Sequence, residues 1–316
     1  MISFRYHIVS IVSVFLALAV GVALGGGPLN REVDNTLVEQ VQADRARKAE
    51  LRSQLAALSS TNAFGDQFAE TIAPGLVGGI LADRVVSFLV LPGAQQTEVA
   101  ALGEMVAVAG GTVGGTVRIG DTLLDVENRQ LVDELGTQLQ AGATGISVPA
   151  DASGYERVGA LLARAIGTDE PGGAAVDGTA DSILAGLSTA GLLSAGEDLK
   201  RRGDLVVVVA GPGQGDQDEV QGASSIVTTV ANALDAGTAG VVVAGPVAAA
   251  RGAGVVRAVR DDVVAARDVS TVDVLGRSAA RVVVAMALAG QANDQTGHFG
   301  AVDAADGAMP GAGTAG

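Results

Sequence analysis

The longest apolar stretch lies at the start of the chain. No Asp, Glu, Lys or Arg occurs between Ile8 and Leu29, and most positions there are Ile, Val, Leu, Ala or Phe. At about 1.5 Å per residue, a helix of this length reaches about 33 Å and crosses a hydrocarbon core of about 30 Å. We therefore predict a transmembrane signal anchor over residues 8–29, with residues 1–7 in the cytoplasm. The side chains expected to contact the membrane include Ile8, Ile11, Phe15, Leu18 and Val22.

Two other interpretations of this stretch stay open. A cleaved secretory signal needs an apolar region of only about 7–15 residues and a small-residue cleavage site, which Ala23 and Gly25 could supply. A buried core helix would also be apolar all round. Gly21 and Gly25 form a GxxxG pair, through which two anchor helices could approach each other closely.

The charges beside the anchor indicate its orientation. Arg5 and the terminal amine precede the anchor, whereas Arg31 is followed closely by Glu32 and Asp34. Because positive charge is retained in the cytoplasm, this places the bulk of the chain on the extracytoplasmic side of the cell envelope. Later apolar runs are too short to span a bilayer, and the chain lacks the alternating strands and aromatic girdles of a transmembrane barrel.

A heptad pattern follows the anchor, over residues 30–62. Its seam positions hold Leu37, Asp44, Leu51 and Leu58 on one side and Asp34, Val41, Lys48 and Leu55 on the other. The apolar members Leu37, Val41, Leu51, Leu55 and Leu58 predict a coiled-coil stalk and hence a homodimer. The polar members Asp44 and Lys48 would weaken such a coil and restrict its register. A single amphipathic helix is the alternative.

Between residues 80 and 290, short apolar runs alternate with helical segments. The strand-like runs are RVVSFLVLPG, TVGGTVRIG, DLVVVVAGPG, GVVVAGP and VSTVDVLG. Continuous Val runs are typical of strands that are covered on both faces. Helices are expected near residues 95–110, 127–140, 154–167, 180–194, 218–236, 250–264 and 278–290. This order predicts an α/β globular domain with a Rossmann-like, doubly wound parallel sheet.

The C-terminal residues 291–316 are rich in Gly and Ala, which predicts a mobile tail. Within this tail the GHFG segment has two open interpretations. It either docks back onto the domain as a short ordered piece or stays mobile with its neighbours.

Composition excludes several partners. The chain has 20 basic against 35 acidic residues and a net charge of −15, so its soluble part lacks the positive field that nucleic acid or anionic lipid requires. It contains no Cys, which excludes disulfides, thiolate metal sites and thiol nucleophiles. We expect no nucleic-acid partner, and contact with the membrane through one N-terminal helix alone.

The loop after the longest Val run is the best candidate for a binding site, because ligands of such sheets collect at the carboxyl ends of strands. Gly211, Gly213 and Gly215 miss the dinucleotide spacing GxGxxG, since Asp216 occupies the third glycine position. The acidic residues from Asp216 to Glu219 either attract a cation or cap the next helix. The candidate loop residues are Gly211, Gly213 and Asp216.

Residue types that carry catalysis or bind copper are scarce. His7 lies at the membrane edge and His298 in the tail, so the domain offers no His-based triad or HExxH zinc site. Met105 and Met286 fall in apolar helix patterns, which leaves no cluster of the Cys, Met and His ligands that copper favours. The sequence therefore predicts a protein that is not an enzyme, with no catalytic residue, cofactor or metal ligand.

Three features of the chain are shared with one known family. They are the opening MISFRYHIVSIVSVFLALAVGVALGGGPL, the stalk, and the tail motif TGHFG. Together they resemble the actinobacterial MctB family of copper transport outer membrane proteins, whose corynebacterial relatives are called SteB. The RYHIVSI segment is the most specific element, and GHFG stands where the family often reads GHYG.

This resemblance implies two functions of different class. One is copper transport or efflux, and copper tolerance, with copper implied by the family label alone; this chain departs from that label in lacking a ligand cluster. The other is a SteB-like coiled-coil dimer scaffold that controls cell division or cell-wall remodelling with a cytoplasmic SteA-like partner. The residues leave open whether the chain belongs to the inner or the outer membrane.

Overall fold

The computed structural model of the protein describes residues 4–25 and 29–311. The chain divides into two compact units, residues 1–64 and 65–316. The first unit contains helix α1 (Phe4–Gly25) and most of helix α2 (Leu29–Val77). Among the described residues, α1 is the one helix long and apolar enough to cross a membrane.

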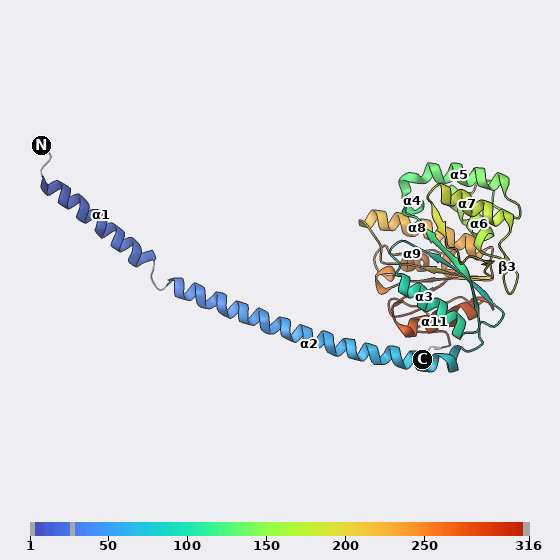
Figure 1. Cartoon of the computed structure of the whole chain (residues 1–316), viewed down its shortest axis with the longest axis horizontal. Helices are drawn as coiled ribbons and strands as arrows, with labels where there is room; N and C mark the ends of the chain where they lie inside the picture. Colours follow the sequence, from blue (N-terminus) through green and yellow to red (C-terminus); the bar gives the residue numbers. More distant parts are fainter. Residues whose placement is uncertain (1–3, 26–28, 312–316) are drawn as a thin grey trace. The chain divides into compact units, whose positions relative to one another are not determined.

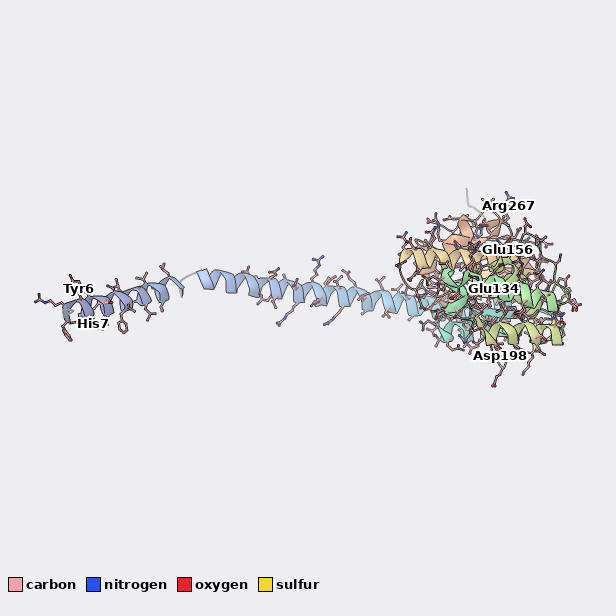
Figure 2. All side chains as sticks on the ribbon, turned by 90° about the horizontal axis from the view of Figure 1, so that it is seen from above. Tyr6, His7, Glu134, Glu156, Asp198 and Arg267 are labelled. Atoms are coloured by element: carbon pink, nitrogen blue, oxygen red, sulfur yellow. The ribbon has the colours of Figure 1, made fainter. Side chains whose placement is uncertain are left out.

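Helix α1 has an apolar surface all round. The five predicted membrane contacts, Ile8, Ile11, Phe15, Leu18 and Val22, are all exposed. Figure 2 shows Tyr6 and His7 projecting from the first turns of the same helix. Exposed apolar area of this extent is unfavourable in water and favourable in lipid, which agrees with a membrane-associated helix. Residues 26–28, part of the predicted span, lie outside the described residues.

Helix α2 is continuous through the predicted stalk and beyond it, to Val77. Val41, Leu51, Leu55 and Leu58 are all at least 47% exposed along it, while the side chain of Leu37 lies outside the described part of the chain. The helical conformation that a coiled coil needs is therefore present. Pairing of this seam with a second helix stays a prediction.

The second unit is built on a seven-stranded sheet with the order β4-β2-β1-β6-β7-β8-β9. Its strands are β1 (Val85–Val90), β2 (Thr112–Ile119), β4 (Leu193–Ala195), β6 (Leu205–Val209), β7 (Gly240–Ala244), β8 (Ser270–Val272) and β9 (His298–Phe299). All neighbours pair in parallel except β4, which is antiparallel to β2. The predicted α/β fold with a mainly parallel sheet is confirmed. A separate ribbon pairs β3 (Ala174–Ala175) with β5 (Arg201–Arg202).

Helices cover both faces of the sheet (Figure 1). One face is covered by α3 (Gln96–Val108), α11 (Ser278–Gln291) and the end of α2. The other is covered by α4 (Asp121–Leu124), α5 (Arg129–Gly142), α6 (Gly154–Ile166), α7 (Gly178–Thr189), α8 (Gln217–Asp235), α9 (Val255–Asp261) and α10 (Ala265–Asp268). Short 3-10 turns lie at Val126–Asn128 and Val247–Ala250.

Strand β6 shows why the sequence contains runs of Val. Val206 and Val208 contact the core under α6 and α8, whereas Val207 and Val209 contact the core under α3 and α11. Successive side chains of a strand point to opposite faces, so a strand covered on both sides needs an apolar residue at every position. All five residues of β6 are fully buried.

The segment predicted as a mobile tail contains the last strand of the sheet. Residues of the GHFG motif form β9, which pairs with β8 through Thr271 and Val272. Asp273, fully buried after β8, accepts hydrogen bonds from the backbone N–H groups of Ala301 (2.7 Å) and Val302 (3.1 Å). The motif therefore docks onto the domain, and residues 312–316 lie outside the described part.

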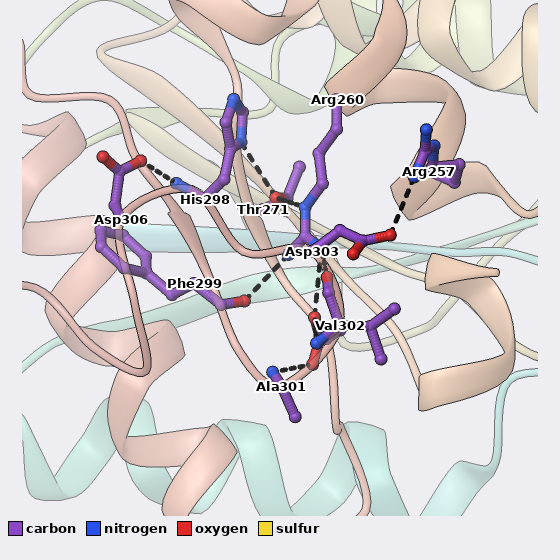
Figure 3. A network of polar contacts seen from close by, with 10 residues as sticks. Arg257, Arg260, Thr271, His298, Phe299, Ala301, Val302, Asp303 and Asp306 are labelled. Atoms are coloured by element: carbon purple, nitrogen blue, oxygen red, sulfur yellow. Dashed lines mark hydrogen bonds and ion pairs between the residues drawn. The ribbon is translucent and has the colours of Figure 1, made fainter.

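Arg260 of α9 joins the same docking network (Figure 3). Its guanidinium lies 3.1 Å from a carboxylate oxygen of Asp273 and donates to the carbonyl oxygens of Phe299 (3.0 Å) and Val302 (2.5 Å). Both charged side chains are almost completely buried, at 6% and 0% exposed. A buried ion pair of this kind is stable only when the surrounding groups also bond to it, as the backbone of residues 299–302 does here.

His298 extends the network as a neutral imidazole. Its Nε2 lies 3.1 Å from the carbonyl oxygen of Ala266, which can only accept, so Nε2 carries the proton. Its Nδ1 then accepts from the hydroxyl of Thr271 at 3.0 Å, and that hydroxyl accepts from Nε of Arg260 at 2.8 Å. Burial, followed by the nearby charge of Arg260, lowers the pKa of His298 below its usual value.

We predict a pH-dependent contribution of His298 to stability. Because folding lowers the pKa of His298, the unfolded chain binds the proton more readily than the folded chain does. This contribution is complete above a pH of about 6.5 and is lost as pH falls from there through the folded pKa. Urea unfolding between about pH 5 and 8 should show this slope in the natural protein and not in His298→Gln. Parallel curves for the two proteins would contradict the prediction.

Candidate functional site

A small cavity lies where the order of the strands reverses. The chain passes from β1 to β2 on one side, then returns through the helical insertion to β6 on the other side of β1. Leu91 and Pro92, after β1, and residues 210–213, after β6, line a cavity of about 260 Å³. Doubly wound sheets bind their ligands at this point, outside the carboxyl ends of the strands.

Glycines let the two loops of the cavity approach each other. A Cβ atom added to Gly211 would collide with the backbone of Gly93, and one added to Gly213 would lie 2.7 Å from Cγ1 of Val220. Gly93 has φ of +80°, a conformation that side chains other than Gly rarely adopt. The candidate residues Gly211 and Gly213 both line the cavity, and they permit its close packing.

Asp216, the third candidate loop residue, caps helix α8. Its Oδ1 accepts the backbone N–H groups of Asp218 and Glu219, each at 3.0 Å. Oε2 of Glu219 accepts the N–H of Asp216 at 2.8 Å, which completes a capping box. The structure therefore places Asp216 as a helix cap and not as a lining residue of the cavity. Of the two interpretations of this acidic turn, the cap is the one that the contacts describe.

The remaining walls come from segments whose sequence pattern does not connect them with this loop. Asp121 is the first residue of α4, which follows β2 in the chain, and Asp125 lies directly after this helix; both line the cavity. Ser224, on the second turn of α8, is buried and lines the interior. Asp121 follows Gly120 directly after a strand, and an acidic residue at the end of a neighbouring strand is the signal that could have identified it.

The charges around the cavity are of one sign. Its lining includes the carboxylates of Asp121, Asp125 and Glu219 and contains no Lys or Arg. Asp125 is already bonded, because it accepts the backbone N–H of Glu127 and a side-chain N–H of Asn128. A phosphate would be repelled from this site. Among the residues that the structure describes, no group of three or more His, Cys, Asp or Glu is arranged to hold a metal ion.

A larger groove of about 890 Å³ lies between α6, α8 and the segment from Gly145 to Pro149. Of its cationic side chains, Arg164 donates from Nη2 to Asp177 at 2.7 Å and keeps a buried Nη1 without a partner among the described residues. Arg202 donates to the carbonyl oxygen of Ala175 at 3.2 Å. The hydrogen bond from Arg164 lowers the pKa of Asp177 to about 2. The lining of this groove carries both positive and negative charges and therefore indicates no single class of ligand. The smaller cavity is the better-defined site.

The fold and the cavity define a doubly wound α/β protein with an apolar helix, α1, near its N-terminus. Residues 1–310 match the family described as "Copper transport outer membrane protein, MctB", and the chain belongs to this family. The resemblance seen in the sequence is thereby confirmed. This family description and the apolar helix α1 agree with a membrane-associated protein of the cell envelope.

Curated relatives carry a matching name. The copper transporter MctB of Mycobacterium tuberculosis is 27% identical over 304 residues, which covers 95% of this chain and 96% of the relative. The protein of the same name from Mycobacterium bovis gives the same values. That of Mycobacterium leprae is 34% identical over 141 residues, or 41% of each chain. The similarity to the first two extends over nearly the whole length of both proteins.

We predict that Asp216 contributes to stability as a cap. Asp216→Ala removes the acceptor of two backbone N–H groups and should lower the free energy of unfolding by about 1 kcal/mol. Asp216→Asn keeps a capping oxygen and should stay close to the natural protein. Urea midpoints of the three proteins, followed by circular dichroism, provide the measurement. An unchanged midpoint in Asp216→Ala would contradict the assigned role.

Proposed function

We propose that this chain is a non-enzymatic, single-pass envelope protein that takes part in copper efflux and so in copper tolerance. The observation that carries the proposal is the family match over residues 1–310, with relatives named copper transporter MctB along 95% of the chain. In this proposal α1 is retained as an anchor and the α/β unit lies on the extracytoplasmic side.

The architecture supports a role for a second component or a second copy in transport. Helix α1 is the one candidate span among the described residues, and a single apolar helix encloses no path for an ion. The exposed seam on α2 supplies a surface through which chains can associate. A copper conduit would therefore be formed between chains, or with an envelope partner.

We predict that the full chain restores copper tolerance to an actinobacterial host that lacks its own family member. Growth in added copper and cell-associated copper, measured by mass spectrometry, are the readouts, and zinc serves as the control metal. A variant that begins with Met followed by residues 30–316 lacks α1 and should fail to restore either property. Unchanged copper content and tolerance with the full chain, at confirmed expression, would contradict the proposed function.

A second candidate function is a dimeric scaffold that presents the α/β unit to envelope partners and contacts a SteA-like protein through its cytoplasmic N-terminus. The specific support is the seam on α2, where Val41, Leu51, Leu55 and Leu58 are between 47% and 65% exposed. An isolated helix with such a stripe is marginal in water, and pairing two copies buries the stripe. The scaffold and copper handling are compatible, because one dimer could serve both.

We predict that seam positions of two chains lie next to each other in membranes. The natural chain contains no Cys, so Leu51→Cys and Leu58→Cys each introduce a single thiol. Mild oxidation should give disulfide-linked dimers of both variants, because seam residues of a parallel coiled coil face their counterparts. Ser53→Cys and Ser60→Cys, two residues off the seam, are the matched controls and should link poorly. Equal or absent linkage at all four positions would contradict the coiled coil.

A further inference from the structure

The cavity beside the ends of β1 and β6 is lined by a polar side chain that the fold leaves without a partner. Ser224 is 4% exposed and lines the cavity, and its hydroxyl makes no hydrogen bond with any of the residues that the structure describes. Serines on helices commonly donate to the carbonyl oxygen four residues earlier, as Ser225 does to Gln221 on the same helix. The oxygen of this hydroxyl stays accessible from the cavity, so a bound molecule can bond to it in place of water.

The rim of the cavity adds a second unused group. The carboxylate of Asp121 has neither a hydrogen bond nor an ion pair with any described residue, whereas Asp125 and Glu219 are bonded within their own turns. No cationic side chain lines the cavity. The rim therefore attracts positive charge and repels negative charge.

The interior between these two groups is apolar. Leu91, Leu124, Val227 and Val255 contribute to its wall, and three of the four, Leu91, Val227 and Val255, are buried. Its volume of about 260 Å³ lies just below the range of about 300–1,000 Å³ for drug-sized ligand sites, so it admits a smaller molecule. An apolar wall with a few convergent polar groups is the usual construction of a small-molecule site.

We propose that this cavity binds a small organic ammonium ion, with its apolar body inside and its charge towards Asp121. The hydroxyl of Ser224 supplies a hydrogen bond within the cavity. This site is separate from the family's copper label and from the proposed seam, and it does not depend on either.

The experiment compares three probes of similar size and shape but different charge: benzylammonium, benzyl alcohol and benzoate. Each is titrated against the full chain in detergent micelles near pH 7, and binding is followed by saturation-transfer NMR of the probe. We expect saturable binding that is tightest for benzylammonium and weakest for benzoate. Equal binding of the three probes, tighter binding of benzoate, or no saturable binding of benzylammonium would overturn the proposal.

Variants assign the binding to the cavity. Ala223→Leu fills the cavity and should abolish saturable binding. Titration of each probe against this variant in the same micelles also measures how much probe binds to the detergent itself. Ser224→Ala should weaken the binding of benzylammonium by up to about tenfold, which corresponds to the loss of one net hydrogen bond. Asp121→Asn should weaken the binding of benzylammonium by a few-fold and leave the binding of benzyl alcohol unchanged.

A charge control completes the set. Glu104→Gln removes an exposed carboxylate from α3, on the opposite face of the sheet, and should change nothing. Circular dichroism of every variant confirms that it folds. Unaltered benzylammonium binding in a folded Ala223→Leu variant would place the binding elsewhere and overturn the proposal.

Discussion

Burial of β6 on both faces determines where the other parts of the α/β unit can lie. Its five residues are fully buried, with alternate side chains in two separate cores. Helices must therefore cover both faces, and the polar loops that join strands to helices can reach water only at the two ends of the strands. The carboxyl end is also where the strand order reverses. The chain after β1 and the chain after β6 lead there to helices on opposite faces of the sheet, α3 and α8, and a cavity lies beside their loops.

The β9 edge of the sheet depends on a different interaction, a buried ion pair. Strand β8 would expose its backbone groups at the edge, and β9 pairs with it. The chain is held there by buried charge: Asp273 bonds the backbone N–H groups of Ala301 and Val302, and Arg260 bonds the carbonyl oxygens of Phe299 and Val302. The GHFG motif is thus a structural element, and the ion pair specifies where it docks.

Local patterns in the sequence predicted most of the sheet, whereas contacts distant in sequence were not visible. The Val runs and the helix boundaries depend on neighbouring residues, so α8, expected over 218–236, is found at Gln217–Asp235. Strand β9 has two residues and no period, and its position depends on Asp273, 25 residues before His298. The loop glycines Gly211 and Gly213 were predictable from their place after a strand. Asp121 and Ser224 reach the same cavity from elements that only the fold brings together.

The proposed dimer concerns two features of the first unit that are exposed in a single chain, the seam on α2 and the apolar surface of α1. A seam with Asp44 and Lys48 among its positions would associate weakly as a free peptide, because polar residues at these positions reduce stability. With α1 as the proposed anchor, α2 would be confined to the membrane surface, and the effective concentration of one stalk near another would rise. Gly21 and Gly25 on α1 have no side chain to hold a neighbouring helix away, so two such anchors would also be able to approach closely. Weak pairing in water and close packing in lipid would then reinforce each other, and removing α1 would weaken the stalk without changing any of its residues.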